Sequence, residues 1–338
     1  MTEQPTDLAV PTPPEARERL EQALFEIRRV IAGQGEMLER VFVCLLSEGH
    51  LLIEGVPGLA KTLTIKTTAG VLGGSFARVQ FTPDLVPSDL VGTRVYRPGE
   101  GVFDTELGPV FCNFLLADEI NRAPAKVQSA LLEVMQERQV TIGHTSYPVP
   151  SPFLVMATQN PIESEGTYPL PEAQVDRFML KVLIGYPERD DELTIVHRQL
   201  EPAPELRQAL TLEELQELQA TAAAVYVDPA LIAYAVSLAE ATREPAAHGL
   251  PDLANWIAYG ASPRGPISLV QASRALALLR GRDYALVEDL TSLAKDALRH
   301  RLVLTYQALA EEVSPDTILD AVIAKVPTPH IQLGRNAA

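Results

Sequence analysis

The sequence has little of what would mark a membrane or secreted protein. Its unbroken apolar runs, such as Val41 to Leu46, are far shorter than the roughly 18 residues that a membrane-spanning helix needs. The first residues, MTEQPTDLAVPTPPEA, contain no lysine or arginine and no apolar core, so they resemble neither a secretory signal nor a transit peptide. The two cysteines, Cys44 and Cys112, lie in apolar sequence outside any paired motif, which favours buried thiols in a reducing compartment. These absences predict a cytoplasmic protein with no membrane span.

Positive charge is also scarce. The 338 residues include 28 lysines and arginines against 44 aspartates and glutamates, for a formal net charge of −16. Such a balance argues against a general binder of nucleic-acid backbones or of anionic membranes. Hydrophobic residues make up 46% and charged residues 21% of the chain, which is typical of a folded globular protein, and the length suggests about two domains.

The pattern of apolar residues divides the chain into three sections. Residues 1–14 carry four prolines among small polar residues and are predicted to be a disordered tail. Residues 15–187 begin with helical periodicity and then alternate short apolar strands with helices, which indicates a parallel sheet covered on both faces. Residues 188–338 contain successive amphipathic helices and no convincing strand. The predicted strands are 50–54, 76–81, 114–118, 153–158 and 179–183, and the helix-start signals of the last section are Asp228-Pro229, Ser262-Pro263 and Ser314-Pro315.

A loop between the first predicted strand and a helix has the features of a phosphate-binding loop. It reads Gly55-Val56-Pro57-Gly58-Leu59-Ala60-Lys61-Thr62. This run matches the pattern G-x-x-x-x-G-K-[ST] except that Ala60 replaces the second glycine. In such a loop, backbone N–H groups at a helix start bind phosphate oxygens, the lysine reaches the β and γ phosphates, and the hydroxyl binds Mg²⁺. An ordinary strand-to-helix turn with a surface lysine is the alternative, and the order of strand, loop and helix disfavours it.

Two carboxylates stand at the end of the predicted strand 114–118: Asp118 is its last residue, and Glu119 follows directly. Strand ends deliver side chains to the edge where a parallel sheet binds ligands, so both acids are expected beside the loop. Asp118 would complete the magnesium shell with Thr62, and Glu119 would orient and activate the attacking water. Acidic pairs are common on surfaces, so this prediction depends on their combination with the loop. Together they predict a site that binds a chain of phosphates and Mg²⁺ and activates a water molecule for attack.

Three longer motifs resemble the MoxR branch of the AAA+ ATPases. They are Asp118-Glu119-Ile120-Asn121-Arg122-Ala123-Pro124, Ala157-Thr158-Gln159-Asn160-Pro161 and the run GTYPLPEAQVDRF at 166–178. The resemblance covers about residues 15–330, and an alanine at position 60 is usual in that branch. It implies an α/β fold, a P-loop AAA+ core with a parallel five-stranded sheet, followed by a smaller all-α lid domain.

The resemblance also implies roles for four further residues. Asn160 corresponds to the first sensor, which places the attacking water opposite the γ-phosphate. Arg177 corresponds to the arginine finger, which reaches the nucleotide of a neighbouring subunit. Arg264 corresponds to the second sensor at the start of a lid helix, where it would couple nucleotide to lid, and Gln34 to the segment near the adenine. From the residues alone, Asn160 could be a turn residue and Arg177 could pair with Asp176, so these roles depend on the resemblance.

Two inserted hairpins are expected from the same resemblance, at 87–111 and 139–149. Related rings that translocate DNA grip it with basic residues on such hairpins. Here 139–149 has no lysine or arginine, and in 87–111 Arg94 and Arg97 stand against four acids. We therefore do not expect these hairpins to bind nucleic acid.

As a whole, the resemblance implies an ATP hydrolase that forms a homo-oligomeric ring, a hexamer in related proteins, and remodels a protein client or assists metal-cofactor insertion. A protein with a von Willebrand factor A domain is the expected partner. Three alternatives stay open: the motor subunit of a magnesium or cobalt chelatase, a nucleotide-controlled binding module, and a DNA-acting motor. Glu119 and Arg177 argue against the binding module, because a pure binder has no chemical need for either.

Overall fold

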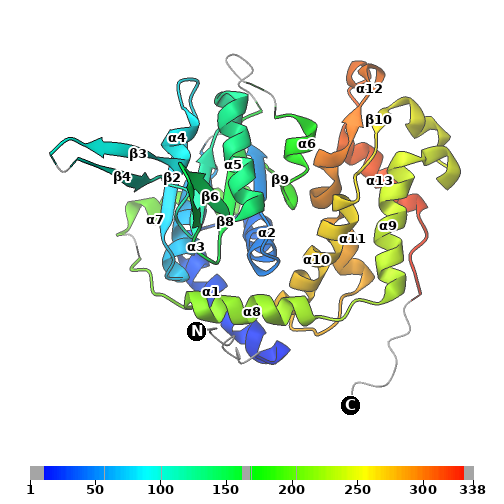
Figure 1. The fold of residues 1–338 in the computed structure, drawn as a ribbon. Coiled ribbons are helices and arrows are strands. Elements are labelled where there is room, and N and C mark those ends of the chain that lie inside the picture. Colours follow the sequence, from blue (N-terminus) through cyan, green and yellow to red (C-terminus); the bar gives the residue numbers. More distant parts are fainter. Residues whose placement is uncertain are drawn as a thin grey trace, which may run out of the picture.

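A five-stranded parallel sheet forms the centre of the first part of the chain (Figure 1). The structure is a computed structural model, and it describes residues 11–330 except 57, 100, 162–167, 169 and 203. The strand order is β2-β5-β8-β1-β9, and every neighbouring pair is parallel. The strands are β1 (Leu51–Gly55), β2 (Phe76–Gln80), β5 (Phe114–Asp118), β8 (Leu154–Gln159) and β9 (Leu180–Ile184). The predicted parallel sheet is confirmed, and each predicted strand end differs from the observed end by one residue at most.

Alternate residues of the strands pack into two hydrophobic cores, one on each face of the sheet. In β1, Leu51 and Ile53 belong to one core and Leu52 to the other, and in β5 Leu116 and Leu115 divide in the same way. This alternation follows from the strand geometry, in which successive side chains point to opposite faces. The first face is covered by α1 (Pro13–Val30), α2 (Gly35–Leu46) and α3 (Lys61–Val71), and the second by α4 (Pro87–Val91) and α5 (Ala125–Glu137).

The first helix begins earlier than expected. Helix α1 starts at Pro13, whereas the predicted tail extended to residue 14, of which residues 1–10 lie outside the described residues. Prolines suit the first turn of a helix because the N–H groups there have no intrahelical partner in any case. Thr12 completes the start, since its backbone N–H donates to Glu15 Oε2 at 2.9 Å.

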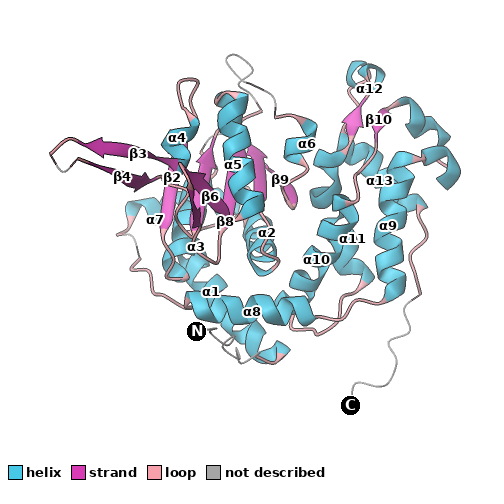
Figure 2. Cartoon of the chain, viewed as in Figure 1, coloured by secondary structure: helices cyan, strands magenta, loops and turns pink. Residues whose placement is uncertain are grey.

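The second part of the chain is mostly helical (Figure 2). Two of its predicted helix starts have the expected caps: Asp228 Oδ1 accepts from the backbone N–H of Ala230 at 2.8 Å, and Ser314 Oγ from that of Thr317 at 3.1 Å. Among the residues that the structure describes, no helix is long and apolar enough to cross a membrane. The helices are α7 (Arg189–Leu200), α8 (Leu212–Ala224), α9 (Pro229–Arg243), α10 (Arg264–Leu279), α11 (Val287–Leu298), α12 (Tyr306–Ala310) and α13 (Pro315–Lys325). Short helical turns of this part are η2 (Pro245–His248), η3 (Pro251–Asn255) and η4 (Arg299–Arg301), and those of the first part are η1 (Ile120–Arg122) and α6 (Glu172–Val175).

This part also contains a small antiparallel sheet. Strand β10 (Ile257–Tyr259) pairs with β11 (Val303–Leu304). The expectation of no further strand was wrong at these residues, although the surrounding fold is helical. Strands of three and two residues are too short to produce a recognisable alternating pattern.

Two hairpins occupy the segments expected to carry insertions. They are β3 (Gly92–Arg97) with β4 (Val102–Leu107), and β6 (Gln139–Ile142) with β7 (Thr145–Pro148). The β3–β4 hairpin extends away from the sheet in Figure 1. Arg97 pairs with Asp104 at 2.5 Å, and the Arg94 guanidinium lies 5.0 Å from the centre of the Phe103 ring. Both arginines of this insertion are therefore engaged within their own hairpin.

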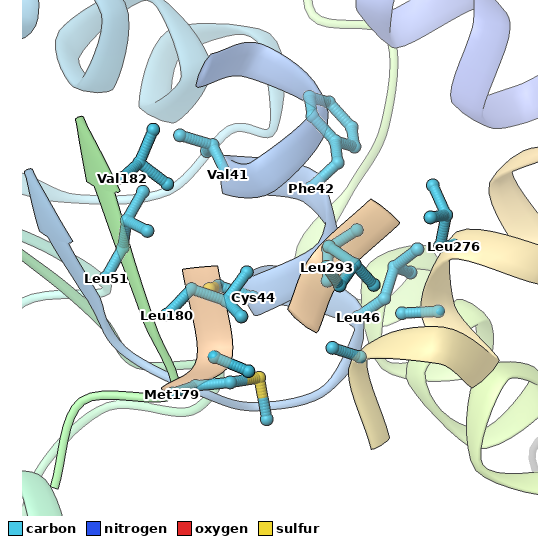
Figure 3. Close-up of a cluster of buried hydrophobic side chains, with 14 of the residues drawn as sticks. Val41, Phe42, Cys44, Leu46, Leu51, Met179, Leu180, Val182, Leu276 and Leu293 are labelled. Atoms are coloured by element: carbon cyan, nitrogen blue, oxygen red, sulfur yellow. The ribbon is translucent and has the colours of Figure 1, made fainter. Parts of the chain in front are cut away.

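Helix α2 lies in a hydrophobic core that the two parts of the chain share. It contacts β1 and β9 of the sheet as well as α8 and α10 of the second part. Figure 3 shows Cys44 close to Leu180 of β9, and Leu46 close to Leu276 of α10 and Leu293 of α11. Because apolar partners surround α2, the second part packs directly against the first rather than hanging from a linker.

Buried ion pairs reinforce the same junction. Arg40 of α2 donates through Nε to Asp296 Oδ2 of α11 at 2.6 Å, and the two side chains are only 5% and 7% exposed. Asp296 Oδ1 also accepts from Arg299, whose guanidinium reaches the backbone oxygen of Lys181 in β9 at 2.6 Å. Charges removed from water in this way are stabilised only when they are paired and hydrogen-bonded. The network therefore fixes how the helical part sits on the edge of the sheet.

His50, which precedes β1, is a buried neutral histidine. Its Nδ1 accepts from the backbone N–H of Val155 at 3.0 Å, and its Nε2 lies 3.1 Å from the backbone oxygen of Met135. Burial, together with the nearby Arg138 cation, lowers the pKa of His50 to about 3. Both ring nitrogens are thus used in packing the first part of the chain, and the imidazole is structural.

The unfolding free energy is expected to fall as the pH drops below about 6.5, because unfolding lets His50 take up a proton that the folded state rejects. For this one group the slope reaches at most about 1.4 kcal/mol per pH unit, and the contribution is present above the unfolded pKa and lost toward the folded pKa. Urea unfolding of the parent and of His50→Gln at several pH values between about 7.5 and 5 measures the difference in slope. His144→Gln, which changes an exposed histidine, is the matched control and should keep the parental slope. Equal slopes for all three proteins would contradict the prediction.

Candidate functional site

The phosphate-binding loop connects the end of β1 to the start of α3, at the carboxyl edge of the sheet. A Cβ on Gly55 would lie 2.4 Å from Ile184 Cγ1 and 2.6 Å from Ile184 O, so a glycine is needed there because β9 runs so close. Ala60 has a φ of +56° and occupies the position at which the motif usually has glycine, at a cost of roughly 1 kcal/mol for a left-handed residue with a side chain. Pro57 lies outside the described residues.

A cavity of about 450 Å³ opens beside the loop. Four stretches of chain that are far apart in the sequence line it, and they meet because the carboxyl ends of parallel strands lie along one edge. Lys61, Thr62, Asp118, Glu119 and Asn160 all lie on its wall. The other lining residues are Gly58, Leu59, Ala60, Leu63, Arg78, Gln80 and Thr158.

Asp118 is held by two neighbouring strands. Its Oδ1 accepts from Thr158 Oγ1 of β8 at 2.6 Å, and its Oδ2 accepts from Arg78 of β2 at 2.6 Å and 3.1 Å. The Thr158 hydroxyl in turn accepts from the backbone N–H of Glu119 at 2.9 Å. Thr158 therefore ties the ends of β5 and β8 together and fixes the direction of the first acid.

Glu119 has a different set of partners. Its backbone is in the left-handed region, with a φ of +55°. Its Oε2 accepts from Gln80 Nε2 at 2.7 Å and from Arg122 Nη1 at 2.9 Å. Sequence reasoning assigned no role to Gln80, Arg78 or Thr158: the first two have no distinguishing local sequence, and Thr158 was noted only as part of the motif that contains Asn160. Only the pairing of β2, β5 and β8 brings them beside the acids.

Lys61 lies at the first turn of α3, facing the two acids. Its Nζ donates to the backbone oxygen of Gly55. Burial lowers the pKa of Lys61, while the carboxylates of Asp118 and Glu119 act in the opposite direction. A half-buried ammonium that uses a backbone oxygen as partner is well placed to bind an anion that enters the cavity.

A second, mostly apolar cavity of about 260 Å³ adjoins the first. It shares Gly58, Leu59, Ala60 and Leu63 with the first cavity, so both cavities lie against the same residues of the loop and of the start of α3. Gln34 lies on its wall and donates through Nε2 to the backbone oxygen of Gly185 at 3.2 Å. The remaining lining residues are Arg29, Val30, Ile31, Ala32, Pro187, Ile195, Arg198, Gln199 and Pro204. The pair of cavities suits a ligand with a flat apolar group joined to a chain of phosphates.

Arg177 and Arg264 lie elsewhere, on the wall of a third cavity of about 340 Å³ that shares no lining residue with the first two. Arg177 donates through Nη1 to the backbone oxygen of Leu132 at 2.9 Å, and its buried Nε has no hydrogen-bond partner among the described residues. Arg264 has a half-exposed side chain whose Nη1 lies 3.7 Å from Asp176 Oδ2. Of the cavities formed by the described part of the loop, neither is lined by Arg177 or Arg264.

Comparisons with known proteins match the first and the second part of the chain to separate family models. The family model described as "ATPase family associated with various cellular activities (AAA)" matches residues 50–180, and the model "AAA lid domain" matches residues 254–322. These two segments contain every predicted site residue except Gln34.

Individual proteins match over most of the chain. It is 56% identical to Chaperone MoxR1 of Mycobacterium tuberculosis, over 92% of this chain and 83% of that protein. It is 40% identical to the uncharacterized protein YeaC of Bacillus subtilis, over 92% and 95% of the two chains. The crystal structure of a protein from Cytophaga hutchinsonii that is described as an ATPase superposes with a TM-score of 0.88 at 46% identity, covering 94% of this chain and 96% of that one.

Proposed function

Because the chain belongs to the MoxR family of AAA+ ATPases and is an ATP hydrolase, we propose that it forms a ring and uses each round of magnesium-dependent hydrolysis to remodel a client protein. The observation that carries this proposal is the separation of the site into two halves. Lys61, Thr62, Asp118 and Glu119 face one cavity, whereas Arg177 faces another. A chain with this layout needs a neighbour to complete its catalytic site.

We assign the phosphates of ATP to the first cavity and its adenine to the second. The backbone N–H groups of the loop and the Lys61 ammonium hold the phosphates at the start of α3, where the helix dipole favours negative charge. The apolar cavity beside Gln34 takes the adenine. Thr62 and Asp118 supply the hydroxyl and carboxylate oxygens that Mg²⁺ prefers, and this ion would neutralise charge on the β and γ phosphates.

Hydrolysis then depends on two residues at the strand ends. Glu119 orients a water molecule toward the γ-phosphate and accepts its proton, and Asn160 fixes the position of the same water. The hydrogen bonds from Gln80 and Arg122 hold the Glu119 carboxylate in one orientation. Preorganised groups of this kind lower the barrier because little reorganisation is left for the moment of reaction.

The third cavity supports a subunit interface. Arg177 would reach the nucleotide of an adjacent chain, where its charge would stabilise the transferring phosphoryl group, and Arg264 at the start of a lid helix would couple the bound nucleotide to the lid. A hexameric ring is the assembly we expect. For the client, the engagement of Arg94 and Arg97 within their own hairpin favours a protein over a nucleic acid, and a protein with a von Willebrand factor A domain is the partner we expect.

Specific ATPase activity should rise steeply with protein concentration and then level off, because assembly brings Arg177 to a neighbour's site. The measurement is magnesium-dependent phosphate release per chain, followed as the protein is diluted through its micromolar range, with light scattering as the parallel measure of assembly. Activity that stays constant while scattering shows dissociation to monomers would contradict a shared site.

A further inference from the structure

We propose that Arg301 of the lid, together with Asp176 and Ser262, positions Arg177 for the site of the neighbouring subunit. The lid of each chain would then determine the position of Arg177, the residue that this chain supplies to its neighbour. This inference rests on the proposed role of Arg177 and adds three positioning residues to it.

The guanidinium of Arg301 holds the backbone on both sides of Arg177. Its Nε donates to Asp176 Oδ1 at 2.8 Å, and its Nη2 donates to the backbone oxygens of Asp176 at 3.1 Å and Phe178 at 2.8 Å. Its Nη1 donates to the backbone oxygen of Met179 at 3.2 Å. One side chain that is 1% exposed thus fixes the residue before Arg177 and the two residues after it.

Arg301 is itself anchored in the lid. It belongs to η4, directly after α11, and Nη2 also donates to Ser268 Oγ of α10 at 3.1 Å. Nη1 donates to the backbone oxygen of Ala297 in α11. Burial lowers the pKa of Arg301 to about 10, against the opposing effect of Asp176, so the guanidinium stays charged at neutral pH. A shift of α10 or α11 would therefore move the segment that carries Arg177.

Asp176 connects this contact to the second arginine. Ser262 Oγ donates to its two carboxylate oxygens at 3.0 Å and 2.9 Å, and Arg264 Nη1 lies 3.7 Å away. Ser262 Oγ also accepts from the backbone N–H of Arg264 at 3.2 Å. Asp176 is thus the shared partner of the lid and of the residue next to Arg177.

The side chain of Arg177 has few bonds that could position it alone. Among the described residues only the Leu132 oxygen is seen to accept from it, and its buried Nε has no hydrogen-bond partner there. Its placement therefore depends on the backbone segment that Arg301 holds. A misplacement of about 1 Å at a catalytic group can cost about 100-fold in rate, so this support affects turnover strongly.

The first test compares the steady-state kinetics of two variants with those of the parent. Arg301→Gln should lower kcat by about tenfold or more while the KM for ATP changes by less than about twofold, because the ATP-binding half of the site is untouched. Ser262→Ala should lower kcat by about fivefold, since it removes one hydroxyl from Asp176 without leaving a buried charge unpaired. Ser292→Ala is the matched control: Ser292 lies on lid helix α11, donates to the backbone oxygen of Asp289 and is not among the residues that line the three cavities, so its kcat should not change.

The second test separates positioning from a general loss of structure. Each variant is mixed with Glu119→Gln chains under dissociating conditions and then allowed to assemble. The Glu119→Gln chain cannot hydrolyse ATP well but supplies an intact Arg177, so the mixture should be more active than the two proteins measured separately. Arg177→Ala mixed in the same way tests the proposed function alone.

The outcomes distinguish the positioning role from the shared catalytic site on which it rests. If Arg177→Ala is rescued by mixing but Ser262→Ala has parental kcat, or if folded Arg301→Gln is not rescued, the positioning role is overturned and the shared site stands. If Arg177→Ala is not rescued, the shared site fails and the positioning role with it. Should Arg301→Gln not fold, Ser262→Ala decides the matter alone.

Discussion

Arg177→Ala is expected to lower kcat by about 10³- to 10⁵-fold, the range by which an arginine that stabilises the transferring phosphoryl group accelerates hydrolysis. The affinity for ATP should stay close to parental, because Arg177 lies outside both cavities that the loop forms. An interaction made only in the transition state affects kcat and leaves ground-state binding intact.

The measurement combines phosphate release at saturating ATP with equilibrium binding of a fluorescent ATP analogue. Arg94→Ala is the control, since Arg94 is exposed on the β3–β4 hairpin and lies over the Phe103 ring, and this variant should hydrolyse ATP normally. If Arg177→Ala hydrolysed ATP at the parental rate, the proposal that Arg177 completes the site of a neighbouring subunit would be wrong.

The second large effect is expected for Glu119→Gln. The amide keeps the size of the side chain and can still accept a hydrogen bond from Gln80 or Arg122, but it cannot accept a proton from water. Loss of a general base typically costs about 10²- to 10⁴-fold in rate, so turnover should almost stop while ATP stays bound. Lys61 and Thr62 are unchanged, and assembly that depends on bound ATP should persist.

Two readouts test this variant. Nucleotide that remains with the protein after gel filtration is identified as ATP or ADP, and the elution volume reports assembly. Lys61→Ala provides the contrast, because loss of the lysine should weaken binding and leave the protein without retained ATP. Unchanged hydrolysis by Glu119→Gln would rule out its assigned role.

Local sequence was sufficient to predict the central sheet and to select residues that the structure brings to the wall of one cavity. The five strands are apolar runs because both faces of the sheet are covered, and the loop and the acids follow such runs directly. Ala60 stands at the position where the loop motif usually has glycine, and it adopts the left-handed backbone that is more typical of glycine.

The contacts that support these residues could not be predicted in the same way. Gln80 reaches Glu119 across 39 residues of sequence, and Arg301 reaches Asp176 across 125. Such contacts arise from strand pairing and from the docking of the lid, and neither leaves a local signal. The resemblance led us to expect Arg177 at a neighbour's site rather than beside its own loop, but the residues alone do not indicate which cavity Arg177 or Arg264 faces.

The shared core around α2 has a consequence for protein engineering. By sequence this helix belongs with the nucleotide-binding part, yet α8 and α10 supply much of its packing. A fragment that ended at Pro187 would present the apolar side of α2 to water and would tend to aggregate, and a lid fragment would lose Arg40, one of the two partners of Asp296. Chimeras that exchange lids between relatives should therefore transfer α2 together with the lid, because these segments form one unit of packing although some 140 residues separate them in sequence.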